Sequence, residues 1–406
     1  MKILRLSSKE IQNLCQRYYC NKKRITEKVR KIIEDVRDQG DKAVLRYTRK
    51  FDKVKLTHKD LKVSTNEING AFQNIDTDFI SSLKTVIGNI EKFHKKQLPK
   101  PWKIKEAEGV QLGEVFRPIE SVGIYVPAGT APLVSSVYMS VLPAKIAGVK
   151  RIVLLTPPTK FKSVDQHILA VANLLKVDEV YKIGGAQAIA ALAFGTKTVP
   201  KVDKIVGPGN DYVTEAKRQV YGYVDIDMLA GPSEIVILAN DFAYKDYVAS
   251  DLRAQAEHLK GLAILVTTSK KFAKAMKKEV NKGYIVLAKN MQQAVEVINR
   301  IAPEHVEVFI KSPNRILKHI RNAGAIFIGP YSPVCVGDYV AGPSHVLPTG
   351  GTAKFFSGLG VRSFLKGTHT ISYSKKALEK ERSAIEKMTK IEGLKDHFES
   401  YQARFK

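Results

Sequence analysis

Between residues 121 and 330, hydrophobic residues come in short β-branched runs that alternate with helical segments. Typical runs are SVGIYVP from Ser121, RIVLLTPP from Arg151 and EIVILAN from Glu234. Most runs are followed by a stretch in which apolar residues recur every three or four positions, the spacing of one helix face. This alternation predicts an α/β fold with parallel sheets covered by helices on both faces. The series fits two doubly wound, Rossmann-like modules better than one large sheet.

The two ends of the chain have a different pattern, which predicts helical N- and C-terminal extensions. In ITEKVRKIIEDVRDQ, apolar residues from Val29 to Val36 recur at helical spacing. Residues 376–404 are also helical in pattern but poor in apolar positions, so they must pack on something else, such as another subunit. We expect four parts: a helical extension over 1–20, a larger α/β domain over 21–120 with 235–355, a second α/β domain over 121–234, and a helical dimerisation segment over 356–406.

Two segments of the predicted modules resemble each other. AGVKRIVLLTPPTKF ends at Phe161 and LKGLAILVTTSKKF ends at Phe272, and each contains a helix end, a glycine turn, an apolar strand and a threonine-containing loop. Either an internal duplication or the sequence pattern common to all βαβ units accounts for this similarity.

Composition narrows the class of protein. A chain of 406 residues that is 44% hydrophobic is neither disordered nor dependent on disulfides. The opening MKILRLSSKEIQNLCQ lacks the apolar core of a secretory signal, and no apolar run reaches the ~18 residues of a membrane helix. We therefore expect a cytoplasmic protein with no membrane partner. Cys15, Cys20 and Cys335 form no CxxC pair, and we expect reduced thiols.

The charge balance raises a second class of function. Lys and Arg number 66 against 40 Asp and Glu, a formal net charge of +26, so binding to nucleic acid is a legitimate hypothesis. The lysines are spread along the chain in runs such as KKFAKAMKKE, without interleaved aromatic residues. This distribution favours a solvated basic surface and no specific nucleic-acid partner.

Two short segments place a histidine beside a polar or acidic residue. Gln255 and His258 are three residues apart near a predicted helix end, so one helix face can direct an amide oxygen and an imidazole toward the same ion. On spacing alone, a surface or hydrogen-bonded pair is the commoner arrangement. Glu304 and His305 follow a helix-ending Pro303, and an acid beside an imidazole suits proton transfer. The alternative is a polar loop with no catalytic role.

Two further segments carry candidates. Residues 337–351 hold many Gly and Pro residues, which predicts a defined loop path with Asp338 as an oxygen ligand and His345 as a second imidazole. Glu392 and His397 lie in the C-terminal helical segment.

Together these segments resemble the histidinol dehydrogenase family from Phe116 to His397. The resemblance is carried by VGIYVPAGTAPLVSSVYM, IGGAQAIAALAFGT, VGPGNDYV, DMLAGPSE, QAEH, APEHVEV, GDYVAGPSHVLPTGGTA and EGLKDH. It implies NAD-dependent oxidation of L-histidinol to L-histidine in a homodimer with one zinc ion per subunit. It implies four groups of site residues: zinc ligands Gln255, His258, Asp338 and His397; acid–base residues Glu304 and His305; substrate contacts that include the zinc ligands, His305, Ser233, His345 and Glu392; and NAD contacts Tyr125, Gln187 and Asn210. His397 and Glu392 are implied to come from the partner subunit.

The predicted NAD site lacks the usual fingerprint, because no GxGxxG motif follows a predicted strand. The dinucleotide is instead expected in loops at the carboxyl ends of the first module's strands. Asn210 follows Gly207-Pro208-Gly209 at a predicted helix start, which suits a phosphate or ribose contact. Two alternatives remain: a related dehydrogenase that acts on another amino or sulfonated alcohol, and a basic nucleic-acid-binding protein that has lost catalysis.

Overall fold

The computed structural model describes residues 1–6, 8–17, 23–128, 131–258 and 260–406, and Cys20 lies outside these ranges. The chain divides into two compact units, the first formed by Met1–Gln97 with Ile119–Phe364 and the second by Leu98–Pro118 with Leu365–Lys406. None of the described helices is long and apolar enough to cross a membrane. Cys15 and Cys335 are free thiols, as expected.

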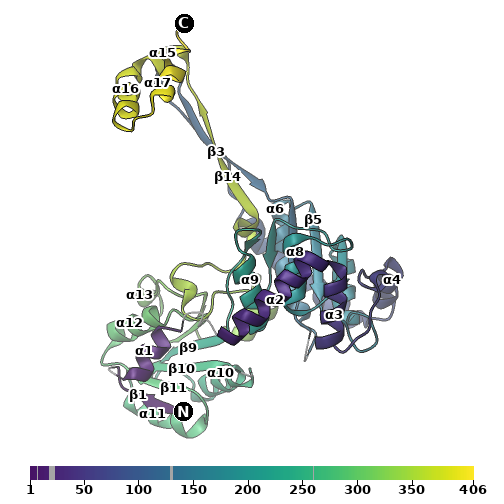
Figure 1. The fold of residues 1–406 in the computed structure, drawn as a ribbon. Coiled ribbons are helices and arrows are strands. Elements are labelled where there is room, and N and C mark those ends of the chain that lie inside the picture. Colours follow the sequence, from purple (N-terminus) through teal and green to yellow (C-terminus); the bar gives the residue numbers. More distant parts are fainter. Residues whose placement is uncertain (7, 18–22, 129–130, 259) are drawn as a thin grey trace. The chain divides into compact units, whose positions relative to one another are not determined.

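The first unit contains a five-stranded parallel sheet in the order β6-β5-β4-β7-β8 (Figure 1). Its strands alternate with helices along the chain, as the hydrophobic pattern predicts. In chain order the elements are β4 (Ser121–Tyr125), α6 (Val134–Ala147), β5 (Arg151–Thr156), α7 (Gln166–Leu174), β6 (Glu179–Lys182), α8 (Gly185–Phe194), β7 (Lys204–Val206), α9 (Asp211–Val220) and β8 (Asp225–Ile226).

Several N-terminal helices pack against the helices that flank this sheet. They are α2 (Lys23–Gln39), α3 (Asp41–Phe51), the 3-10 turn η1 (His58–Asp60), α4 (Thr65–Gln73) and α5 (Thr77–Lys95). The buried face of α2, with Val29 and Val36, shares one apolar cluster with Tyr125 and Val153 of the sheet. The sequence predicts that residues 21–120 belong with 235–355, whereas the apolar cluster that contains α2 and α3 includes residues of the five-stranded sheet. Helix periodicity shows which face is apolar but not which sheet that face covers.

A six-stranded parallel sheet forms the second part of the first unit, in the order β1-β11-β10-β9-β12-β13. In chain order its elements are β1 (Lys2–Leu4), α1 (Lys9–Cys15), β9 (Glu234–Ala239), α10 (Lys245–Glu257), β10 (Leu262–Thr267), α11 (Lys270–Glu279), β11 (Tyr284–Leu287), α12 (Met291–Ile301), β12 (His305–Phe309), α13 (Asn314–Leu317) and β13 (Ala325–Ile328). The predicted extension over 1–20 is therefore not purely helical, because β1 extends the edge of this sheet beside β11.

The two sheets have equivalent strand orders. Strands β6-β5-β4-β7-β8 of the first correspond in order to β11-β10-β9-β12-β13 of the second, and β1 is an addition at one edge. The echoing segments fall on β5 and β10, which occupy the same place in the two orders. An internal duplication and independent formation of two βαβ sheets would both give this correspondence of strand orders.

The Gly- and Pro-rich segment after β13 begins as a helix and not as the loop that its composition predicts. Helix α14 (Val334–Tyr339) contains Gly337 and Asp338, and the 3-10 turns η3 (Thr352–Lys354) and η4 (Val361–Phe364) follow later. A Cβ on Gly337 would lie 2.6 Å from the Phe327 ring, so this glycine permits close packing on β13. The glycine content of this segment predicts a loop, but at Gly337 the glycine serves close helix–strand packing.

The second unit combines a three-stranded antiparallel sheet with short helices. Its elements are β2 (Trp102–Lys105), η2 (Ala107–Gly109), β3 (Gln111–Pro118), β14 (Leu365–Ser372), α15 (Lys375–Lys380), α16 (Arg382–Ile391) and α17 (Lys395–Gln402), with β3 between β14 and β2. The helices over 376–404 agree with the predicted pattern. The segment 356–406 is not purely helical, however, because β14 pairs along its full length with β3, which is distant in sequence.

Candidate functional site

The three residues predicted to contact NAD lie on three elements at the carboxyl end of the five-stranded sheet. Tyr125 is the last residue of β4 and Gln187 lies in the first turn of α8. Asn210 is the N-cap of α9, and its side chain accepts hydrogen bonds from the backbone N–H groups of Tyr212 (3.0 Å) and Val213 (3.2 Å). The strand order reverses between β4 and β7, the place where doubly wound sheets bind dinucleotides.

Close backbone packing joins these elements. The Gly185 N–H donates a 3.0 Å hydrogen bond to the hydroxyl of Tyr125, whose pKa burial raises to about 12. The phenol therefore stays neutral and keeps a proton to donate. Gly207 has a φ of +114°, and a Cβ there would lie 2.1 Å from the carbonyl oxygen of Tyr125. Only glycine fits this crossing of the β7–α9 loop over β4.

Unsatisfied polar atoms mark the same edge. Gln187 is 1% exposed, and among the described residues neither atom of its amide has a hydrogen-bond partner. Asp52, which follows α3, has a buried carboxyl oxygen that likewise lacks a partner in the described part of the chain. Buried polar atoms without partners are costly, so they suit a polar ligand such as a dinucleotide.

Asp52 was missed by the sequence analysis. Its other carboxyl oxygen would lie 3.2 Å from a Cβ on Gly184, and burial raises the pKa of its carboxyl group to about 6. Its neighbours in sequence are a helix end and lysines, which gave no signal of a site.

Glu304, one of the two predicted acid–base residues, lies in the second part of the unit, just before β12. Its carboxylate accepts a 2.9 Å hydrogen bond from the backbone N–H of Glu234 at the start of β9, and Ser233 also hydrogen-bonds to it. Burial raises the pKa of Glu304 to about 8, so the carboxyl group is largely protonated at pH 7. The structure thus brings Ser233, a predicted substrate contact, into hydrogen-bonding distance of Glu304.

The predicted base, His305, is the first residue of β12 and is 3% exposed. Its Nδ1 lies 3.1 Å from the carbonyl oxygen of Glu234, which can only accept, so the proton is assigned to Nδ1. Its Nε2 has no hydrogen-bond partner among the described residues. Burial lowers the pKa of His305 and keeps the ring neutral, which leaves Nε2 with a lone pair able to accept a proton.

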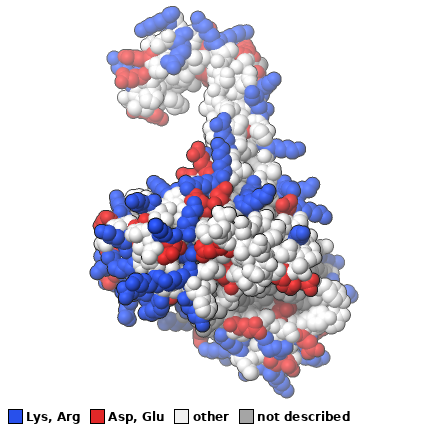
Figure 2. Space-filling view, turned by 90° about the vertical axis from the view of Figure 1, so that its right-hand side faces the viewer, with Lys and Arg blue, Asp and Glu red and all other residues white. Residues whose placement is uncertain are grey.

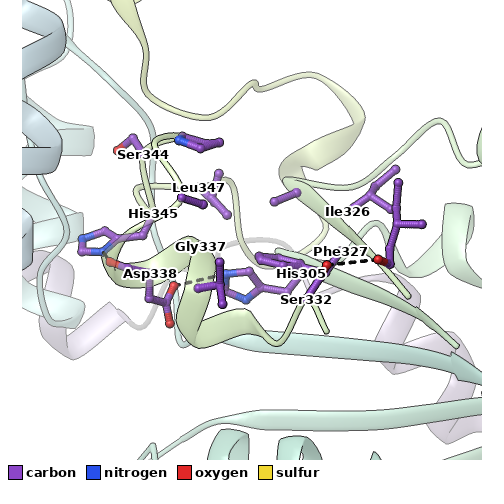
Figure 3. Close-up of a pocket in the computed structure, with 14 residues that line it drawn as sticks. His305, Ile326, Phe327, Ser332, Gly337, Asp338, Ser344, His345 and Leu347 are labelled. Carbon is purple, nitrogen blue, oxygen red and sulfur yellow. Dashed lines mark hydrogen bonds and ion pairs between the residues drawn. The ribbon is translucent and has the colours of Figure 1, made fainter. Parts of the chain in front are cut away.

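His305 opens onto a cavity of about 330 Å³ that also contains Asp338 and His345 (Figure 3). The Asp338 carboxylate lies 3.8 Å from Nε2 of His305, and burial raises its pKa to about 6. His345 Nδ1 lies 3.0 Å from the carbonyl oxygen of Asp338, and its Nε2 lies 3.4 Å from the hydroxyl of Ser136 on α6. Much of the remaining lining is apolar, with Phe327 and Leu347 among the residues.

Gln255 and His258 both lie near the end of α10, but the structure does not place them on one helix face as their spacing predicts, because His258 follows the helix with extended backbone. Gln255 is buried on the helix and His258 is its exposed C-cap. A Cβ on Gly261 would lie 2.2 Å from the Gln255 carbonyl oxygen and 2.9 Å from Cβ of His258, so this glycine lets the chain turn closely past the end of the helix. The Gln255 amide nitrogen has no partner in the described ranges.

The remaining predicted ligand, His397, lies in the second unit on α17, and Glu392 precedes that helix as the C-cap of α16. Both side chains are exposed. Within the described residues of this one chain, no three His, Cys, Asp or Glu side chains are grouped closely enough to hold a metal ion. The His258 imidazole and the Asp338 carboxylate are groups that zinc binds, whereas the Gln255 amide oxygen belongs to an uncommon class of zinc ligand.

On the face drawn in Figure 2, Lys and Arg side chains are widely scattered, with acidic side chains among them. This arrangement is typical of the solvated basic surface that the sequence favoured.

Comparison with known proteins identifies strong similarity over the whole chain. The profile described as histidinol dehydrogenase matches residues 15–405. A histidinol dehydrogenase from Listeria monocytogenes is 50% identical over 404 residues, covering 95% of this chain and 94% of the relative. One from Clostridium acetobutylicum is 45% identical over 417 residues, covering 98% and 96%. The crystal structure of histidinol dehydrogenase from Elizabethkingia anophelis matches with a TM-score of 0.94 at 36% identity, covering 100% of this chain and 98% of that one.

Proposed function

This chain belongs to the histidinol dehydrogenase family, and from that premise we propose that it oxidises L-histidinol through L-histidinal to L-histidine, with NAD as oxidant and zinc as metal. The first half-reaction converts the alcohol and NAD⁺ to the aldehyde, NADH and a proton. The second adds water to the aldehyde and transfers a hydride from the resulting diol to another NAD⁺. It yields the carboxylate, NADH and two protons.

The observation that carries this proposal is the position of His305, which is buried with its Nδ1 at 3.1 Å from the Glu234 carbonyl oxygen. Each half-reaction removes a proton from an oxygen as hydride leaves the neighbouring carbon, so a neutral base must act twice. The hydrogen bond from Nδ1 to the Glu234 carbonyl leaves Nε2 as that base, facing the cavity. A neutral imidazole that is buried and fixed in one tautomer is suited to this task.

Glu304 has a task only in the second half-reaction. In its ionised form it can take a proton from the water that attacks the aldehyde, and its pKa of about 8 makes that form accessible at mildly alkaline pH. The Glu234 backbone N–H and Ser233 stabilise the ionised form by hydrogen bonding.

The residues at the carboxyl edge of the five-stranded sheet suit NAD. When bound, NAD would accept the hydride that leaves the substrate. Tyr125 offers a neutral hydroxyl, Gln187 an unpartnered amide, and Asn210 a polar side chain at a helix start. Asp52 adds a buried carboxyl oxygen suited to a ribose hydroxyl.

For zinc, we propose Gln255, His258 and Asp338 from one subunit and His397 from a second copy. The support is the donor chemistry and the exposed position of His397 in a separate unit. Bound zinc would supply a Lewis acid for the substrate's amine and imidazole. We also propose that Glu392 and His345 contact the substrate, because the sequence resembles the histidinol dehydrogenase family at these positions.

The direct test is NADH absorbance with L-histidinol as the only substrate. We expect two NADH per histidinol, loss of turnover after chelation, and recovery on adding zinc. An unchanged rate in protein shown by elemental analysis to be free of metal contradicts the zinc assignment. No NADH from histidinol, but turnover of another amino alcohol, contradicts the substrate assignment.

A mixing experiment tests the shared site. If His397 serves the other subunit, co-refolding inactive His305→Asn and His397→Ala subunits places one undamaged site in each mixed dimer. We expect activity to return only after subunit exchange. Mixtures that stay inactive, although mass spectrometry shows mixed dimers, place His397 in its own subunit's site.

A further inference from the structure

The most deeply buried ion pair that the structure describes near the predicted NAD site is formed by Lys217 and Asp227. Lys217 lies on α9 and Asp227 directly follows β8. Their side chains are only 2% and 1% exposed, and the Lys217 Nζ donates a hydrogen bond to a carboxylate oxygen of Asp227. Removing two charges from water is expensive, so a pair this deep depends on further hydrogen bonds.

Both members of the pair hydrogen-bond to the backbone of the same residue, Gly207. The Lys217 Nζ donates a 3.0 Å hydrogen bond to the Gly207 carbonyl oxygen, and the Gly207 N–H donates a 2.8 Å bond to Asp227. Gly207 is the residue whose positive φ and contact with Tyr125 let the loop cross the end of β4. The ion pair therefore fixes the start of the Gly207–Asn210 loop at both of its backbone polar groups.

Asp227 also begins the linker that leads from the first sheet to the second. The Met228 N–H donates a 2.6 Å hydrogen bond to Asp227, and further along, the Thr214 hydroxyl of α9 donates a 2.8 Å bond to the Ala230 carbonyl. The linker ends at Ser233 and enters β9 at Glu234, whose peptide groups contact Glu304 and His305. One buried ion pair thus touches the start of both segments.

We propose that Lys217 and Asp227 are a positioning pair that holds the Gly207–Asn210 loop in its dinucleotide-binding conformation and in register with the linker that carries Ser233. Neither residue contacts the reacting atoms; both act through Gly207 and Met228. The proposal rests on the proposed NAD site, and wild-type protein that does not bind NADH would remove both together.

The test is the dissociation constant for NADH in three variants, measured by fluorescence on zinc-loaded protein. Lys217→Met removes the cation. Lys217→Met with Asp227→Asn also removes the buried anion, so it avoids leaving one charge uncompensated. The control is Lys204→Met, because Lys204 is also buried on β7 and pairs at 2.7 Å with Asp225, but at the opposite end of the strand.

We expect about a tenfold or larger rise in the NADH dissociation constant for both Lys217 variants, and less than about a twofold change for Lys204→Met. The KM for NAD should rise more than kcat falls, which a general loss of folded protein does not produce. If wild type binds NADH and either folded Lys217 variant binds it equally well, the positioning role is overturned while the proposed function stands.

A wild-type measurement covers the case in which both Lys217 variants fail to fold. Hydrogen exchange on peptides that contain Gly207 and Met228 should show protection before NADH is added, because both N–H groups already donate to Asp227. Rapid exchange of these amides in ligand-free protein, with protection only after NADH, contradicts a preset loop.

Discussion

The two parallel sheets of the first unit share a strand order, yet the candidate residues lie at opposite ends of equivalent strands. In the five-stranded sheet they follow the carboxyl ends of β4 and β7, at Tyr125 and Asn210. In the six-stranded sheet they lie at the amino-terminal starts of β9 and β12, at Ser233 and at Glu304 with His305. The same strand order therefore carries candidate residues at the carboxyl ends of the strands in one sheet and at the amino ends in the other.

The difference reflects what each strand end offers. Carboxyl ends lead into helix starts, whose N–H groups and glycine turns suit a phosphate-bearing ligand. At the start of β9, a single residue, Glu234, presents its N–H to one acid–base residue and its carbonyl to the other. Burial then raises the pKa of Glu304 and lowers that of His305. The first end suits ligand recognition and the second sets proton affinity.

The largest expected effect that separates the two ends comes from His305→Asn. Loss of the base should lower kcat for both half-reactions by about 10²–10⁴-fold, the usual contribution of general base catalysis. The dissociation constant for NADH should not change, because the cofactor end is untouched. His319→Asn, at an exposed position in the same unit, is the matched control. A large change in NADH affinity in His305→Asn would show that the two ends are not separate.

Glu304→Gln should act on one half-reaction. We expect oxidation of L-histidinal to slow by about 100-fold and oxidation of L-histidinol to aldehyde by much less, since only the aldehyde step needs activated water. Single-turnover measurements starting from each compound resolve the two. Equal slowing of both would mean that Glu304 supports His305 and does not activate water.

A change at the other end, Gln187→Ala, should weaken NADH binding by about tenfold, the value of one hydrogen bond to a buried amide. kcat at saturating NAD should stay within about twofold of wild type. Unaltered NADH binding by the folded variant would remove Gln187 from the cofactor site and would weaken the assignment of the carboxyl edge.

The smallest effect is expected for Asn210→Ala, which removes the N-cap of α9. Loss of the two backbone hydrogen bonds should lower the free energy of unfolding by about 1 kcal/mol. Denaturant unfolding measures this change. Asn290→Ala, which removes the N-cap of α12 on the other sheet, is a matched control for stability and should leave NADH affinity unchanged.

The alternation of strands and helices could be predicted because the spacing of apolar residues within each element reflects which of its faces is buried. The position of Asn210 at a helix start was predicted and is confirmed for this local reason. His305 follows the helix-ending Pro303, as predicted, and is the first residue of β12. The strands β1 and β14 were missed, since a short or exposed strand exists only through its partner elsewhere in the chain.

Protonation could not be predicted from sequence. The tautomer of His305 depends on a carbonyl 71 residues away, and the pKa of Glu304 depends on its burial by folding. Asp52 was missed for a similar reason, because packing of α3 on the sheet brings it to Gly184. The roles of all the candidate site residues, from the NAD contacts to His258, Glu392 and His397, stay predictions.

The most direct test of the account is the pH dependence of L-histidinal oxidation in wild type and in Glu304→Gln. Burial raises the pKa of Glu304 above its ordinary value to about 8, so the active carboxylate is lost as pH falls through 8. We predict that the wild-type rate rises with pH with a midpoint near 8 and that this rise is absent in Glu304→Gln. The same midpoint in both proteins would contradict the assignment of Glu304 as the group that activates water.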